Sequence, residues 1–220
     1  YSEIRQQEKQ LEAQRAELQR QKQAQMNEIR RKKFEYAKRM VAEYRERAAF
    51  TDKEEEETYY LDLAEYAYCL SYADPDKLNR QGSQQGYMVT KVTMDDLCSE
   101  PVAPTGTTIA NRFIAQDVQM KQIAERKIKL YKAQQNTDIP ISEGLNFFLD
   151  GAIAFAAKAA TENPTADNYI FLAQLQTNTS NILAFSSIMV AQSIDADALD
   201  GSNKKLYNVI KDGATREIDQ

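Results

Sequence analysis

The first fifty residues combine a mostly polar surface with apolar positions at helical spacing, and they contain no Gly, Pro, Asp or Thr. Most are Gln, Glu, Arg, Lys, Ala, Leu or Met, the residue types that lose least on entering a helix. At about 1.5 Å per residue, such a helix spans roughly 75 Å, which is more than a compact domain of this size requires. The pattern predicts one long polar helix over residues 1–50, with its C-terminal half docked on the body and its N-terminal half reaching away.

The apolar positions of this helix form a narrow stripe. Ile4, Leu11 and Leu18 recur every seven residues, and Leu18, Ile29 and Met40 recur every eleven. A seven-residue step favours a left-handed supercoil and an eleven-residue step a right-handed or straight one. Glutamines occupy the positions three residues after the seven-residue series, where a dimeric zipper has apolar side chains. These five residues are therefore candidate interface residues, although the zipper signature is weak.

Helical patterns separated by turns continue after residue 50. The sequence predicts a capping box at Thr51 and Glu54 that opens a helix ending before Pro75. Longer helices are expected at residues 109–135, 143–161 and 166–194. A short last helix around Leu206 is expected to stop at Gly213.

Residues 74–106 read as a loop-rich insertion between these helices. A polar loop is expected over residues 74–86, and a short strand or extended chain over residues 87–92. A single helical turn is expected to begin at Thr93.

These elements predict an all-α protein. A long N-terminal polar helix (residues 1–50) serves as an arm for oligomerisation. An irregular bundle of about four helices (residues 51–213) forms the body and carries the loop-rich insertion, and residues 214–220 form a tail.

The charge is unevenly distributed, although the net charge is only −5. Residues 1–50 hold 13 Lys and Arg against 8 Asp and Glu, whereas the remainder holds 15 against 25. A basic arm beside an acidic body favours an acidic protein partner, another copy of this chain included. The arm's one dense basic cluster is residues 30–33, and acids interrupt the rest, so nucleic acid is not the favoured partner.

The chain has no histidine and only two cysteines, Cys69 and Cys98. The first absence removes His-dependent acid–base catalysis and the commonest zinc sites, and two thiols are too few for a four-cysteine site. A Cys69–Cys98 disulfide would contribute roughly 3–4 kcal/mol in the chain-entropy model. We slightly favour this pairing, and with it a periplasmic or envelope location, over two free thiols in a cytoplasmic protein.

No other spacing indicates a catalytic, cofactor-binding or metal-binding residue, so an enzyme is not expected. Asp195, Asp197 and Asp200 precede Gly201, but their spacing does not fit a calcium-binding EF-hand loop. The longest apolar run, residues 182–194, is too short and too polar to span a bilayer. We therefore expect no membrane crossing through this segment.

A motif in the C-terminal third begins Asn163-Pro164-Thr165-Ala166-Asp167-Asn168-Tyr169 and continues with Leu172, Leu175, Gln176, Phe185 and Ser186. It resembles the F-type conjugative pilus assembly family called TraF, in which such a helix precedes a thioredoxin-like domain. The chain lacks a C-x-x-C motif and thioredoxin-like strand–helix alternation, so the resemblance carries over no redox role. It implies a periplasmic subunit of a type IV secretion or conjugation apparatus.

The sequence thus leaves three functions open. The first is a structural subunit of a multi-protein bacterial envelope machine, related to type IV secretion or conjugation, that contacts neighbouring copies or subunits through its N-terminal helix. The second is a cytosolic coiled-coil adaptor with free thiols. The third is a pilus-tip or minor-pilin protein, because a Gln-rich leading helix and an Ala-rich body are similar in style to such proteins.

Overall fold

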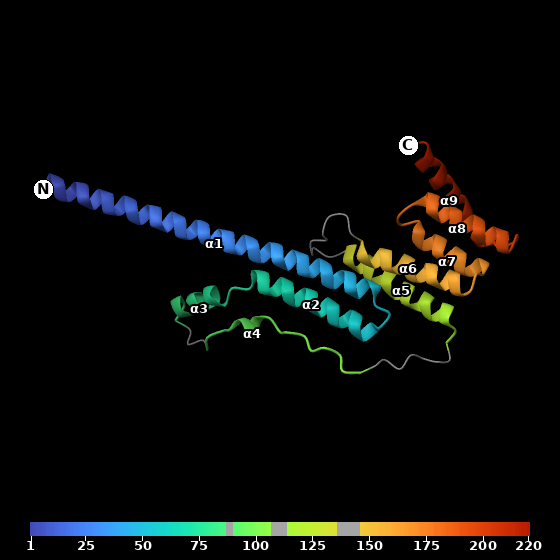
Figure 1. Cartoon of the computed structure of the whole chain (residues 1–220), viewed down its shortest axis with the longest axis horizontal. Helices are drawn as coiled ribbons and strands as arrows, with labels where there is room; N and C mark the ends of the chain where they lie inside the picture. The colour runs from blue at the N-terminus through green and yellow to red at the C-terminus, as the bar shows by residue number, and fades with distance from the viewer. Residues whose placement is uncertain (87–89, 107–113, 136–145) are drawn as a thin grey trace. The chain divides into compact units, whose positions relative to one another are not determined.

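The computed structural model describes residues 1–86, 90–106, 114–135 and 146–220. These residues form helices and no strand, which confirms the all-α prediction (Figure 1). The helices are α1 (Ser2–Phe50), α2 (Glu54–Tyr72), α3 (Pro75–Gln84), α4 (Met94–Leu97), α5 (Gln116–Gln135), α6 (Phe147–Glu162), α7 (Ala166–Gln176), α8 (Asn181–Ile194) and α9 (Asn203–Ile218).

The chain divides into two compact units. Residues 1–43 and 62–101 form the first unit, and residues 44–61 and 102–220 form the second. The helices α1 and α2 are each divided between the units, with one segment in the first unit and another in the second.

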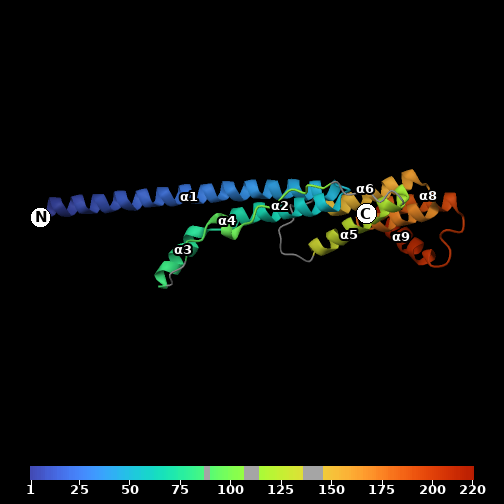
Figure 2. The same ribbon diagram turned by 90° about the horizontal axis from the view of Figure 1, so that it is seen from below.

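In the first unit, α1 is a single unbroken helix that exposes every residue up to Tyr36. Its first buried side chains are Ala37 and Val41. From Asp62 onward, α2 lies alongside this part of α1 in both views (Figures 1 and 2). The covered part of α1 within this unit therefore begins near Ala37.

A disulfide bond and a pair of hydrogen bonds hold the chain around α4 in the first unit. The sulfur atoms of Cys69 on α2 and Cys98 after α4 lie 2.05 Å apart, the pairing that the sequence slightly favoured. The Asn79 side chain of α3 donates to the Val92 carbonyl at 2.9 Å and accepts from the Val92 amide at 2.8 Å. Together these contacts hold α4 and its flanking chain to α2 and α3.

The second unit is a series of helices in which each packs on the next along the chain, from α5 to α9. One apolar cluster joins α5, α6 and α7, with Ile123, Phe155 and Leu172 among its buried residues. Another joins α7, α8 and α9, with Ile188 and Ile210 fully buried. Residues of α7 enter both clusters, so this helix links the two halves of the core.

Two glycines allow close helix contacts in the second unit. A Cβ atom at Gly151 of α6 would lie 2.4 Å from the backbone oxygen of Ala49, near the end of α1. A Cβ atom at Gly213 of α9 would lie 2.5 Å from the side chain of Asn181. Gly213 is therefore a packing position inside α9, which continues through it to Ile218. The prediction of a helix stop at Gly213 is wrong.

Residues 74–86 are mostly helical, which corrects the prediction of a loop. Asp74 is the N-cap of α3, and its side chain accepts from the Lys77 amide at 3.0 Å. Pro75 fills the first helical position, where its missing N–H costs nothing. The Asp-Pro pair therefore ends α2 and also starts α3.

Two other helix limits differ from the sequence prediction. The expected helix over residues 166–194 is divided into α7 and α8, because the Ser180 hydroxyl caps a new helix by accepting from the Leu183 amide. At the start of α2, Thr51 lies before the helix, and its hydroxyl donates to Glu56. The expected starts at residues 109 and 143, and most of the expected extended segment 87–92, lie outside the described residues.

We predict that Gly151→Ala lowers the free energy of unfolding by about 1–3 kcal/mol, because the methyl group would force α6 away from the Ala49 carbonyl. An unobstructed glycine in a helix would instead gain stability on this change. Gly106→Ala is the control for an added methyl group without a clash: Gly106 lies outside the helices, nothing lies within 4 Å of a Cβ atom there, and stability should change little. Urea denaturation measures both; a Gly151→Ala protein as stable as the parent would contradict the close contact.

Candidate functional site

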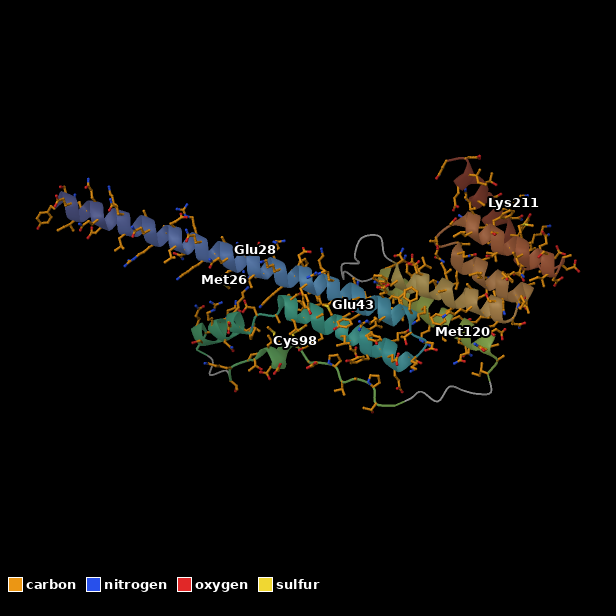
Figure 3. The ribbon with its side chains drawn as sticks, viewed as in Figure 1. Met26, Glu28, Glu43, Cys98, Met120 and Lys211 are labelled. Atoms are coloured by element: carbon orange, nitrogen blue, oxygen red, sulfur yellow. A yellow bond between two sulfur atoms is a disulfide. The ribbon has the colours of Figure 1, made fainter. Side chains whose placement is uncertain are left out.

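The most extensive unpartnered apolar feature of α1 is a stripe along its exposed part, which we call the α1 stripe: Ile4, Leu11, Leu18, Met26 and Ile29. Each of these side chains is between 49% and 59% exposed. At 3.6 residues per turn, they lie within about 40° of one line along the helix. Figure 3 labels Met26 in this part of α1. The helix thus presents a straight, narrow apolar strip to solvent.

The line of the stripe runs along the edge of the face that α1 buries further along, since Ala37 and Val41 lie about 60° and 100° round the helix from Ile4. Met40 lies on the same line as Ile4, and it is half-buried between Ala37 and Val41. Of the five residues selected from the sequence, four are exposed, and Met40 lies where the covered part of α1 begins.

Local side-chain pairs support the exposed part of α1. Arg31 donates to both carboxylate oxygens of Glu28, at 2.7 and 3.0 Å, and Arg20 pairs with Glu17 at 3.0 Å. The Arg31 guanidinium lowers the pKa of Glu28. Such pairs one turn apart each contribute about 0.2–0.5 kcal/mol to a helix. Helicity is therefore favoured here without tertiary packing.

The second unit buries an ionic cluster that the sequence analysis did not select. Lys127 of α5 is fully buried, and its Nζ donates to the Glu57 carboxylate and to the Ala48 carbonyl. Arg126 Nε donates to the same carboxylate at 3.0 Å. The Ala48 carbonyl belongs to the last turn of α1, where carbonyls lack helical partners. Lys127 therefore caps the C-terminal end of α1, and Glu57 lies in the first turn of α2, both matching the helix dipoles.

The environment of Lys127 indicates a structural role. Burial lowers the pKa of Lys127 below its ordinary value of 10.5, while the hydrogen bond that Lys127 donates to Glu57 opposes that shift. The ammonium also lies 5.9 Å from the centre of the Phe155 ring. With no exposed surface, Lys127 is inaccessible to a substrate in this arrangement. The spacing of the sequence could have indicated that Lys127 is buried, because it lies four residues from both Ile123 and Tyr131. All three are buried on one side of α5.

A carboxylate from α9 caps the N-terminus of α8. Glu217 accepts from the backbone amides of Asn181 and Ile182 at 2.7 and 3.0 Å, and from the Ser180 hydroxyl at 3.1 Å. These hydrogen bonds, led by that of Asn181, lower the pKa of Glu217. The contact fastens the last helix to the start of α8.

The described part of the chain offers no constellation for a metal ion. It contains no group of three or more His, Cys, Asp or Glu side chains placed to bind one. In the acidic turn after α8, the Asp195 carboxylate accepts from the Asp197 amide at 3.1 Å. No helix among these residues is long and apolar enough to cross a membrane.

The described residues form surface depressions within each unit. One of about 470 Å³ lies beside the disulfide and is lined by Tyr72 and Leu78, among others. Another of about 270 Å³ lies between α5 and α6 and is lined by Met120 (labelled in Figure 3) and Thr161. The Thr161 hydroxyl donates to the Ala157 carbonyl of its own helix at 2.9 Å, which leaves it engaged in the fold.

No family model, curated protein or solved structure matches this chain. The proposed function therefore rests on the geometry of the chain itself.

We predict that Lys127→Met lowers the free energy of unfolding by about 3–5 kcal/mol, because it leaves the buried Glu57 carboxylate without its ammonium partner. Lys129→Met, on the exposed side of the same helix, is the control and changes stability by less than about 0.5 kcal/mol. Adding Glu57→Gln to Lys127→Met costs less than the two changes summed, as expected for groups in contact. Additive losses in urea denaturation would mean that the groups are energetically independent.

We predict that Glu217 contributes to acid sensitivity. Its pKa is lower in the folded protein than in the unfolded chain. The carboxylate therefore stabilises the fold above its ordinary pKa of 4.5, and this stabilisation is lost as the pH falls through the lowered folded-state value. Glu217→Gln should flatten the decline of melting temperature below pH 4.5. An unchanged decline would contradict the role of Glu217 as a charged cap.

Proposed function

We propose that this protein is a non-enzymatic structural subunit of a multi-protein bacterial envelope machine, related to type IV secretion or conjugation. In this function, α1 contacts neighbouring copies or subunits through the α1 stripe. The bundle of the second unit serves as a folded body, and the disulfide-bonded segment of the first unit braces α2.

The observation that carries the proposal is the complete exposure of α1 from Ser2 to Tyr36. Long helices in proteins owe most of their stability to packing of an apolar face. Here the apolar face continues beyond the part that is covered, and it is narrow, straight and accessible. A partner helix along this face would supply the missing packing. Protein assembly accounts for the stripe better than nucleic-acid binding does, because acids such as Glu28 neutralise part of the basic cluster.

Two weaker observations favour the envelope. The Cys69–Cys98 pairing is typical of proteins exposed to an oxidising compartment. The motif beginning at Asn163 resembles the TraF family, and its Thr165 caps α7 by accepting from the Asn168 amide at 3.2 Å. The side-chain amide of Asn168 donates to the Asp117 carboxylate of α5 at 3.1 Å, so these motif residues serve packing as well.

A cytosolic coiled-coil adaptor is the alternative, and it uses the same exposed helix. The two proposals differ in the state of the cysteines in the cell. Non-reducing mass spectrometry on protein from its native compartment distinguishes them, because a quantitatively free Cys69 would remove the argument for the envelope.

We predict that the intact chain sediments as a dimer or larger species at micromolar concentration and that Leu11→Glu combined with Leu18→Glu makes it monomeric. The two added carboxylates would otherwise be buried without partners against another helix. The matched control adds the same charges on the opposite side of α1, as Ala13→Glu with Ala24→Glu. If the intact chain and both variants sediment alike as monomers, self-assembly through the stripe is wrong.

A further inference from the structure

The spacing of the α1 stripe is close to palindromic. Ile4, Leu11, Leu18 and Met26 are separated by seven, seven and eight residues. The midpoint between Ile4 and Met26 is position 15. The midpoint between Leu11 and Leu18 lies half a residue before that position. If two such helices lie antiparallel with a two-fold axis near Arg15, Ile4 therefore meets Met26 of the second copy. Leu11 meets Leu18 of the second copy in the same register.

The charged residues on the same face fit this arrangement. At 3.6 residues per turn, Glu8, Arg15 and Lys22 all lie within about 40° of the line through Ile4. Glu8 and Lys22 are each seven residues from Arg15, so the antiparallel register places Glu8 of one copy against Lys22 of the other, twice. A parallel, in-register pair would instead place each of the three against its own counterpart, and like charges facing each other are destabilising.

Among these charged residues, like charges face each other in the antiparallel pair only at the axis. There the two Arg15 side chains approach each other, but Glu12 from each copy lies on the same flank, one turn away. An isologous two-fold contact requires a self-complementary surface, and this face provides one.

We infer that α1 pairs in an antiparallel manner with α1 of a second copy, about a two-fold axis near Arg15. The inference rests on the proposed function and names the partner of the α1 stripe. The contact spans the exposed residues from Ile4 to Met26. With only two apolar layers and one exposed ionic contact on each side of the axis, the dimer is weak and sensitive to salt.

Disulfide trapping on the full chain tests the register. Ile4→Cys and Met26→Cys change exposed side chains, so both variants keep the fold, which circular dichroism checks. In the antiparallel pair the two position-4 sites are about 33 Å apart along the axis, as are the two position-26 sites. Under mild oxidation with the native disulfide intact, an equal mixture should give a covalent dimer joining the two variants, and each variant alone should remain monomeric.

The outcomes separate the inference from the proposed function. Efficient dimerisation of Ile4→Cys alone would show parallel arms, which overturns the inference and leaves arm-mediated assembly standing. Absence of cross-linking in a protein that still sediments as an arm-dependent oligomer would overturn the inference in the same way. Absence of both cross-linking and oligomers would overturn both.

A charge exchange supplies an independent readout. Glu8→Lys, or Lys22→Glu, should raise the dissociation constant of the dimer about fivefold or more, because two ionic contacts become repulsive in each case. Combining them should restore affinity to within about twofold of the parent. Glu17→Lys, which lies on the opposite side of the helix beside Arg20, makes the same charge change and should have little effect. If the double variant instead lost as much dimer affinity as the two single variants lose together, the antiparallel register would be overturned.

Discussion

An amphipathic helix depends on something to cover its apolar face, and α1 is covered over only part of its length. Its first buried side chain is Ala37, while the apolar line continues through Ile29 and Leu18 to Ile4 in full contact with solvent. Propensity and short-range ion pairs keep the exposed part helical, but they are small contributions. The uncovered line is therefore the feature on which the proposed function rests.

The other end of α1 is fixed by contacts that tolerate little change. In the second unit, the Ala48 carbonyl accepts from the buried Lys127 ammonium, and the backbone of Ala49 lies against Gly151 with no room for a side chain. Glu57 completes the cluster from the first turn of α2. A buried charge pair of this kind adds less stability than its geometry suggests, but losing one partner is costly. Within the second unit, the arrangement specifies where α1 ends and how α2 begins.

The sequence predicted the features that depend on local chemistry. Residues 1–50 read as one helix because propensity and pattern agree, and a single turn was expected to begin at Thr93, where α4 starts. The capping box was expected at Thr51 and Glu54, but the structure forms one at Thr93 and Asp96, while the Thr51 hydroxyl donates to Glu56. Prediction from the sequence failed where one residue serves two elements or where packing decides: Pro75 both ends α2 and starts α3, and α9 passes through Gly213. Lys127 was missed because a lysine normally indicates a solvent-facing position, and its partners lie about seventy residues away in the chain. The stripe was visible from the sequence, and the expectation that the N-terminal half of the helix reaches away agrees with the exposure of residues 1–36.

The central claim is that the exposed part of α1 obtains its packing from another polypeptide. Amide hydrogen exchange at several protein concentrations tests this most directly, because exchange reports local opening of each helix segment. Between Ile4 and Ile29, exchange should slow as the concentration rises from sub-micromolar to about a hundred micromolar, while exchange around Ala48 stays constant. Rates over Ile4–Ile29 that do not depend on concentration would contradict self-association through this helix.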